Sequence, residues 1–224
     1  MRVAVLLTIV SATLIASAIS GCGETATGTS SPAALRLQRE DLVAVTRALR
    51  RAEGSIGQEV TAARTGWAVV ADGLAASIPA STLPAVRTAA QKARQVVVPT
   101  LLTEERAREL TGPGAGIVGR FRTFAGLATR GWAMIAAAIE GIEQGTPTVA
   151  GFHRANVALY IDSVYDGHFE LSEIGKSLLA AYSSLGGAPA FDGTLTGQEV
   201  DALADAYSPG AARLEPHPGV VLGS

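Results

Sequence analysis

Hydrophobic residues recur at helical spacing along most of the chain, and no segment shows the apolar/polar alternation of a half-buried β-strand. The clearest stretch places an apolar residue at every seventh position: Leu35, Leu42, Leu49, Ile56, Ala63 and Val70. This spacing predicts one long helix that packs along a coiled-coil-like seam. Pro79 is expected to end it, because proline breaks the backbone hydrogen bonds of a helix.

Further helices are predicted between the breaks that proline and glycine impose. A second helix is capped by Ser81 or Thr82 and runs to about Val98, where Pro99 interrupts it. The remaining predicted helices are a short one in "TEERAREL" and others over about 115–144, 147–165, 171–185 and 197–207. The sequence therefore predicts an all-α fold, a four-helix up-and-down bundle with long helices plus two short C-terminal helices.

The N-terminus has a different pattern, in which Arg2 precedes an uncharged apolar run over 3–19. A positive start followed by such a run is typical of a secretory signal. The run ends in "ISGC" at 19–22, and Cys22 is the only cysteine in the chain. This segment resembles the lipobox of bacterial lipoproteins. The resemblance implies cleavage before Cys22 and lipidation of its sulfur, whereas the alternative is an uncleaved anchor helix with an incidental cysteine.

These patterns predict the domain organisation and the location of the protein. The predicted segments are a lipoprotein signal peptide over 1–21, a flexible tether over 22–32, a helical bundle domain over 33–207 and an irregular tail over 208–224. The lipobox resemblance implies a membrane-held protein on the extracytoplasmic face of a bacterial cell membrane. An exported chain with a net charge of −2 is not expected to bind nucleic acid. The expected partners are the membrane, through the lipid on Cys22, and an unknown protein or cell-envelope component.

A repeat at a 26-residue offset is the main candidate for metal chemistry: "YDGHFELSEI" begins at Tyr165 and "FDGTLTGQEV" at Phe191. The first copy resembles the Ca²⁺ loop of an EF-hand over 162–173, although Val164 stands where that family has an oxygen donor. The resemblance implies calcium ligands at Asp162, Asp166, Glu170 and Glu173, with the backbone carbonyl of His168 beside them. Such a set of oxygen ligands suits Ca²⁺.

The same letters have a purely structural interpretation, in which each copy is a turn followed by the start of a helix. In the second copy, Thr196 and Glu199 have the spacing of a capping box, and Leu195 and Val200 that of a hydrophobic staple. The second copy also lacks most of the acids that a calcium loop needs. The sequence leaves both interpretations of the first copy open.

No familiar catalytic motif is present. The three histidines, His153, His168 and His217, are not at zinc-binding spacing, and Glu140 with Glu143 is expected to be solvated. Trp67 and Trp132 are expected to be core anchors. The sequence therefore predicts a non-enzymatic, lipid-anchored binding or interaction module. The alternatives are a calcium-binding EF-hand-like surface protein and an enzyme whose motif is not recognisable.

Overall fold

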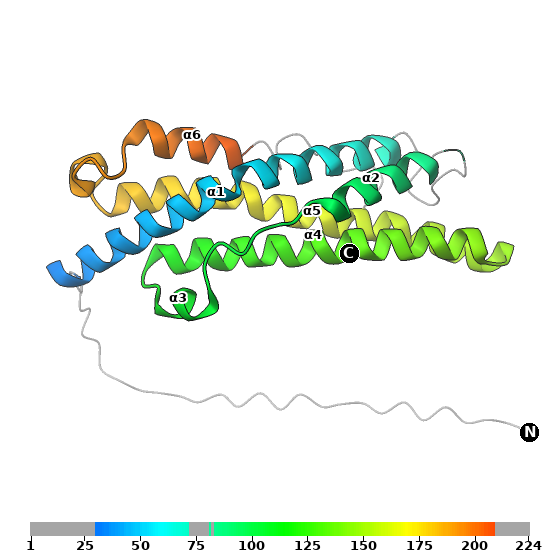
Figure 1. Ribbon diagram of the computed structural model, residues 1–224, viewed down its shortest axis with the longest axis horizontal. Helices are drawn as coiled ribbons and strands as arrows, with labels where there is room; N and C mark the ends of the chain where they lie inside the picture. Colours follow the sequence, from blue (N-terminus) through cyan, green and yellow to red (C-terminus); the bar gives the residue numbers. More distant parts are fainter. Residues whose placement is uncertain (1–29, 72–80, 82, 209–224) are drawn as a thin grey trace, which may run out of the picture. The chain divides into compact units, whose positions relative to one another are not determined.

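The computed structural model of the chain describes residues 30–71, 81 and 83–208. Within these ranges the protein is all-α, with six α-helices, one short 3₁₀ helix and no strand (Figure 1). The helices are α1 (Pro32–Ala71), α2 (Leu83–Gln95), α3 (Glu104–Glu109), α4 (Pro113–Gln144), α5 (Pro147–Ser184), η2 (Ala188–Phe191) and α6 (Gly197–Tyr207). The predicted all-α class is confirmed.

Three long helices carry the fold (Figure 1). Helices α4 and α5 are antiparallel neighbours along most of their length and make the most extensive helix pair of the molecule. Helix α1 runs in the same direction as α4, and the shorter α2 returns beside both of them. Helix α6 lies against α5 and the first half of α1.

Helix α5 corrects the sequence prediction, because the separate helices expected over 147–165 and 171–185 form one helix of 38 residues. The Asp166–Gly167 pair, which suggested a turn, lies inside this helix. A Cβ atom on Gly167 would lie 3.3 Å from the backbone oxygen of Phe124 and 3.3 Å from Cβ of Leu127. The glycine therefore permits the close approach of α4 and does not end α5.

The connection from α2 to α4 follows from local chemistry. Helix α2 ends at Gln95, before the predicted Val98, and residues 96–100 are non-helical. Pro99 explains this, since the residue before a proline is pushed away from the helical region. Thr103 then caps α3 by accepting a hydrogen bond from the backbone N–H of Arg106. Gly112, with a φ of 60°, permits the turn into α4.

The start of α6 agrees with the structural interpretation of the second repeat copy. The hydroxyl of Thr196 accepts from the backbone N–H of Glu199, and the Glu199 carboxylate accepts from the backbone N–H of Thr196. This confirms the predicted capping box. Leu195 and Val200, which flank it, are both buried. At the other end of α6, the Tyr207 hydroxyl donates to the carbonyl oxygen of Leu49 at 2.7 Å and ties α6 to α1.

The buried residues form two clusters along the long helices. The first core joins the first half of α1 and of α4 to the second half of α5 and to α6, with Leu101 and Leu110 closing one side. The second core joins the end of α1, the second half of α4 and the first half of α5 to α2. Helices α1, α4 and α5 contribute to both cores, whereas α6 contributes only to the first and α2 only to the second.

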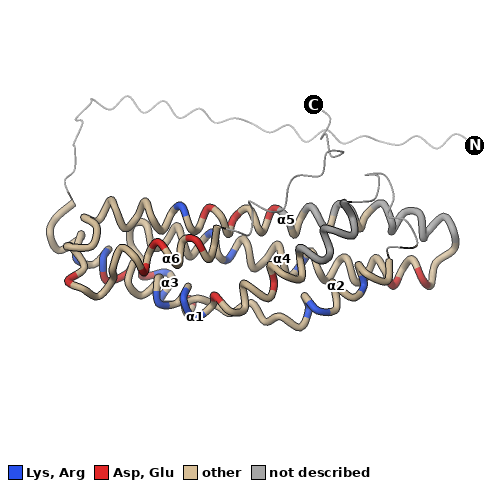
Figure 2. Tube along the Cα trace, turned by 90° about the horizontal axis from the view of Figure 1, so that it is seen from above, with Lys and Arg blue, Asp and Glu red and all other residues tan. Residues whose placement is uncertain are grey.

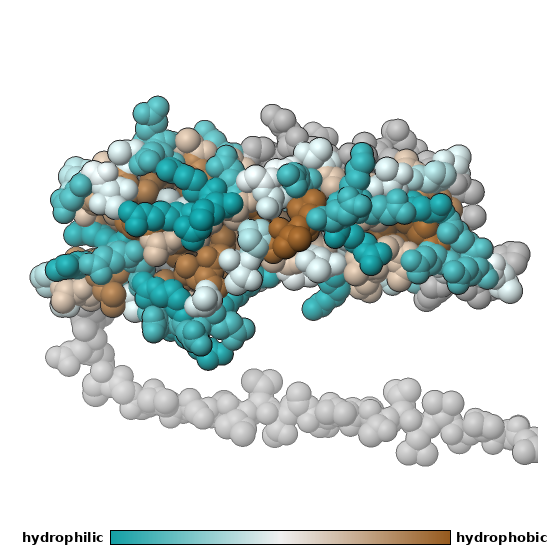
Figure 3. All heavy atoms as spheres, viewed as in Figure 1, coloured by the Kyte–Doolittle hydropathy of each residue, from teal (hydrophilic) through white to brown (hydrophobic). Residues whose placement is uncertain are grey.

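The surface is mixed in charge. Helix α1 carries both acidic and basic residues along its length, whereas α6 carries acidic residues and no basic ones (Figure 2). Hydrophilic side chains cover most of the face in Figure 3, with hydrophobic ones visible between them near its centre. A search of the described helices found none with the length and apolar character that crossing a membrane requires.

Candidate binding site at the boundary of the two cores

A layer of three side chains separates the first core from the second. Glu59 of α1, Trp132 of α4 and His168 of α5 each stand at the level where their helix passes from one core to the other. Their exposed fractions are 1%, 3% and 0%, so all three are buried. We call this set the boundary layer. A carboxylate and an imidazole at this depth need polar partners, because burial without them is costly.

The Glu59 carboxylate is the centre of the boundary layer. Its Oε1 accepts a hydrogen bond of 3.0 Å from the indole Nε1 of Trp132. Its Oε2 lies 2.6 Å from Nε2 of His168, within ion-pair distance. At this distance the two buried groups are partners of one another, so both oxygens of Glu59 are paired. The other ring nitrogen, Nδ1, lacks a hydrogen-bond partner within the described chain. The layer is thus closely paired around Glu59, with one polar atom of His168 left over.

Asp41 shows how a buried carboxylate looks when its role is structural. Its side chain is fully buried. One oxygen accepts from the guanidinium of Arg106 at 2.6 Å, and the other accepts from the backbone N–H and the hydroxyl of Thr111 at 2.9 and 3.0 Å. These bonds tie the α3 connection to α1 and leave both oxygens paired. Glu59 has two partners, Trp132 and His168, against three donor groups on Asp41, and it differs from Asp41 in that it lines a cavity.

Two glycines hold α4 and α5 close together at the boundary layer. A Cβ atom on Gly131 would lie 2.5 Å from Cγ2 of Val164 and 3.2 Å from the backbone oxygen of Tyr160. Gly167 makes the reciprocal close contact with α4 one turn away. Interlocked backbones of this kind leave little room for adjustment. Trp132 and His168, which follow these glycines directly in sequence, are therefore held on a rigid pair of helices.

A cavity of about 150 Å³ opens beside the boundary layer. It is lined by Glu59, Ala93, Arg94, Val96, Val98, Ala128, Thr129, Trp132 and Ala133. Five of these residues are alanine or valine. Three others bring a carboxylate, an indole and a guanidinium to one small space. A mostly apolar hollow with a few convergent polar groups is the usual form of a small-molecule site.

The rim of the cavity is formed where α2 ends. Val96 and Val98 line the cavity, and Val97 between them is 79% exposed. Arg94, in the last turn of α2, is exposed and has no hydrogen-bond or ion-pair partner among the described residues. The cavity therefore combines the buried carboxyl group of Glu59 with a rim guanidinium that no acid of the described residues neutralises.

The four predicted calcium ligands are not arranged as a loop. The segment 162–173 is helical throughout, so the predicted loop is wrong. At 1.5 Å per residue, its ends are about 16 Å apart along the axis, which is too far for one ion. The side chain of Asp162 lies outside the described residues. Calcium binding stays an untested prediction without support from this arrangement.

The other three predicted ligands are described, and they do not converge. Asp166 is exposed. Glu170 pairs with Arg120 of α4 at 2.9 Å. Glu173 accepts a hydrogen bond from Lys176, which lowers the pKa of this carboxyl. In the described part of the chain, no three His, Cys, Asp or Glu side chains gather as a metal site would require.

The remaining sequence expectations have mixed outcomes. Trp132 is a core anchor as predicted, and its indole also serves the boundary layer. Glu140 and Glu143 are exposed as predicted, and Glu143 forms an ion pair with Arg87. Cys22, His217 and the side chains of Trp67 and His153 lie outside the described residues.

The sequence contained a signal for the boundary layer that motif searching missed. Val45, Ala52 and Glu59 follow one another at seven-residue intervals, so Glu59 continues an otherwise apolar row on the buried face of α1. His168 likewise stands between the buried Val164 and Leu171. An ionisable residue on an apolar seam predicts a buried polar group. Only the fold shows that these two seams meet.

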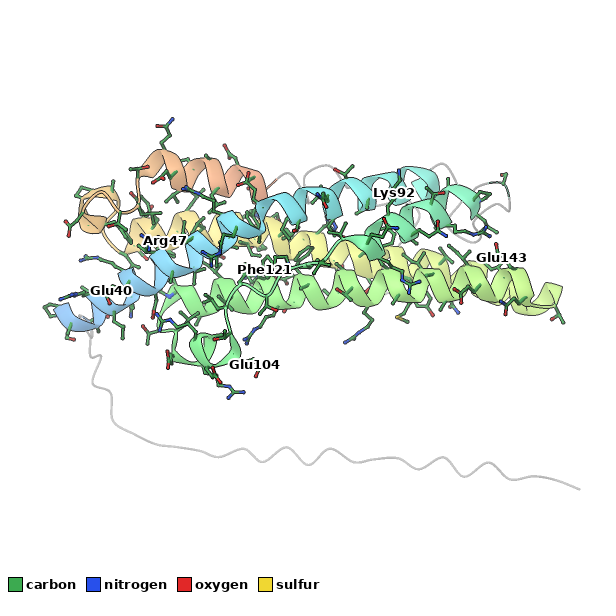
Figure 4. All side chains as sticks on the ribbon, in the orientation of Figure 1. Glu40, Arg47, Lys92, Glu104, Phe121 and Glu143 are labelled. Atoms are coloured by element: carbon green, nitrogen blue, oxygen red, sulfur yellow. The ribbon has the colours of Figure 1, made fainter. Side chains whose placement is uncertain are left out.

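Two wider grooves on the surface are less distinctive. One, of about 690 Å³, includes Arg36, Arg39 and Arg47 of α1 (Arg47 is labelled in Figure 4). Arg36 pairs with Glu40, Arg39 donates to the carbonyl of Leu185, and Asp192 also lines this groove, so much of its charge is already balanced. The other, of about 670 Å³, lies between α1 and α2 and includes Lys92. Neither contains a buried ionisable group.

Comparison with known proteins found no matching family model, no similar curated protein and no similar solved structure.

Proposed function

We propose that this protein is a lipid-anchored, extracytoplasmic binding module whose ligand site is the cavity beside Glu59. The scaffold that we propose is an up-and-down bundle of four helices at each level, with α2 and α6 completing opposite ends. The observation that carries the proposal is a buried carboxylate, held by Trp132 and His168, that lines a small, mostly apolar cavity. A ligand that donates a further hydrogen bond to this carboxylate would gain affinity from the surrounding apolar walls.

Binding fits the cavity better than catalysis does. Among the described residues that line it, Glu59 is the only one with a carboxyl group, and none is a histidine or cysteine. His168 contacts Glu59 from within the protein, which suits a positioning residue. Acid–base chemistry on a substrate generally needs a donor and an acceptor that both reach the reacting atoms.

The ligand site is tested by a probe panel on the full mature chain. The panel holds small amines, amino acids, carboxylates and neutral sugars, each measured by thermal melting and by tryptophan fluorescence in a Trp67→Phe background. We expect at least one probe to raise the melting temperature and change the emission of Trp132, because a bound molecule would contact this indole. The effect should be lost in Glu59→Gln. No response to any probe, or an equal response in Glu59→Gln, would contradict the proposal.

The anchor is tested separately. We expect mass spectrometry of the N-terminal peptide from the native host to find a lipidated cysteine at position 22. Cys22→Ser should release the protein from membranes or leave it unprocessed. An unmodified Cys22 in a secreted or uncleaved chain would overturn the lipoprotein proposal without affecting the ligand site.

A further inference from the structure

We infer that the cavity binds a small zwitterion, an α-amino acid with a short apolar side chain. The inference rests on the proposed function, and it names the class of ligand from the charges at the cavity. Glu59 brings a buried carboxylate from α1, and Arg94 brings a guanidinium from the end of α2. A molecule with one ammonium and one carboxylate group matches both charges at once.

The ammonium end is matched by Glu59. One carboxylate oxygen accepts from Trp132 and the other pairs with His168 at 2.6 Å, while Glu59 also lines the cavity. Each carboxylate oxygen has a second lone pair, so the three N–H donors of an ammonium group can add a hydrogen bond to this carboxylate. The bond is charge-assisted, so it is stronger than one from a neutral ligand. The His168 ring contacts Oε2 and keeps the carboxylate in place. The ring itself packs edge-to-face against Phe124, with 5.9 Å between the ring centres.

The carboxylate end is matched by Arg94. This guanidinium has no ion-pair or hydrogen-bond partner in the described residues, although it borders both the cavity and the neighbouring recess that holds Glu140 and Glu143. Arginine presents paired N–H groups that fit a carboxylate in bidentate fashion. Because Arg94 lies at the exposed rim, it can also capture the ligand as it enters.

The size and lining of the cavity set the rest of the ligand. A cavity of about 150 Å³ holds a molecule the size of benzene, with about six non-hydrogen atoms. Alanine has that number. Apart from Thr129, the uncharged walls near Ala93, Val98, Ala128 and Ala133 offer no hydrogen-bonding side chain, so they favour a methyl group over a polar side chain.

The test uses the full mature chain and three matched probes: L-alanine, ethylamine and propionate. Ethylamine lacks only the carboxylate of alanine, and propionate lacks only its ammonium. Affinity is measured by calorimetric titration and by the change in Trp132 emission. We expect L-alanine to bind at least about tenfold more tightly than either fragment, because each fragment leaves one charged group unmatched.

Variants assign the two ends of the ligand. Glu59→Gln should weaken the binding of L-alanine and of ethylamine at least about tenfold, without weakening propionate, which has no ammonium group. Arg94→Gln should weaken the binding of L-alanine to a similar degree and leave the affinity for ethylamine unchanged. Lys92→Gln is the control, because it stands on the same helix but lines the α1–α2 groove. Arg94 is exposed, so its variant is expected to fold even if Glu59→Gln does not.

The outcomes separate this inference from the proposed function. If ethylamine binds as well as L-alanine and Glu59→Gln abolishes both, the cavity is a binding site for amines and the zwitterion inference is wrong. If L-alanine binds but Arg94→Gln and Lys92→Gln behave alike, the assignment of the carboxylate end is wrong. If neither the matched probes nor the wider panel binds, both the inference and the proposed function fail.

Discussion

The two cores of this protein are built from side chains of different size. The first core contains Phe121, Phe124, Tyr182, Phe191 and Tyr207 among its buried residues. Among the described side chains, the second core has one fully buried aromatic residue, Trp132, with Tyr160 partly buried against it, and its alanines are Ala62, Ala63, Ala89, Ala90, Ala93 and Ala138. Large side chains stabilise by the area that they bury, whereas alanines allow helices to approach closely. The same three long helices therefore use two packing modes in succession.

The boundary layer and its cavity lie at the level where the packing changes from one mode to the other. Helix spacing depends on the side chains at the contact, so a change from large to small side chains is a natural place for imperfect packing. Glu59, Trp132 and His168 stand at this change, and the cavity opens beside them. The site therefore lies where the two cores meet and is lined by residues of both, such as Ala93 and Trp132 of the second core and Ala128 of the first.

The largest expected effect is truncation in the first core. Phe121, labelled in Figure 4 on the first half of α4, is 2% exposed. Phe121→Ala should lower the free energy of unfolding by about 3–5 kcal/mol, because it removes buried area and leaves a cavity. Urea unfolding measures this change. Phe169→Ala is the matched control. Because Phe169 is 50% exposed, this variant should lose far less free energy of unfolding. Equal losses in the two variants would show that the first core is not close-packed.

The second core should respond most to enlargement. Ala138 is buried in the second core and its neighbour Ala137 is exposed on the same helix. Ala138→Leu should cost about 1–3 kcal/mol by overpacking, while Ala137→Leu should leave stability nearly unchanged. Thermal melting of the two variants provides the measurement. A neutral Ala138→Leu would mean that the second core has room to spare, and the contrast between the two packing modes would not hold.

The cap of α6 gives a smaller effect, confined to the first core. Thr196→Ala removes the hydroxyl that accepts from Glu199 and should lower the free energy of unfolding by about 1 kcal/mol. The control is Thr123→Ala, an exposed mid-helix threonine of α4 whose hydroxyl bonds only within its own helix. Chemical denaturation of the two variants decides the matter. The prediction fails if the Thr123 variant loses as much stability as the Thr196 variant.

The pH dependence of that cap is the smallest effect. The pKa of Glu199 is lowered from its ordinary value of 4.5, first by the backbone N–H of Thr196 and then by Arg50. A carboxyl whose folded pKa is lowered stabilises the fold above its unfolded pKa and loses this contribution as pH falls through the folded pKa. The melting temperatures of wild type and Glu199→Gln should therefore differ at neutral pH and converge below 4.5. A gap that persists in acid would assign the effect to packing.

The helix content was predictable because periodic apolar residues and proline breaks are local signals. The capping box at Thr196 and Glu199 was predictable for the same reason. Gly167 was misinterpreted as a turn because its role, close contact with α4, depends on a helix distant in sequence. The boundary layer was missed for a related reason. Glu59 and His168 are 109 positions apart in the sequence numbering, and only the packing of α1 against α5 brings them within 2.6 Å.

The central claim is that the boundary layer serves binding and does not stabilise the fold. The most direct test is the ligand-free unfolding free energy of the double variant Glu59→Gln/His168→Gln, measured in urea. The glutamine that replaces Glu59 can still accept from Trp132 and can donate to the glutamine that replaces His168, so both ionisable groups are removed and the amides have partners. Replacing a buried ion pair by well-packed uncharged side chains is often neutral or stabilising. We predict a free energy of unfolding equal to or above that of wild type, whereas a loss of more than about 3 kcal/mol would contradict the account.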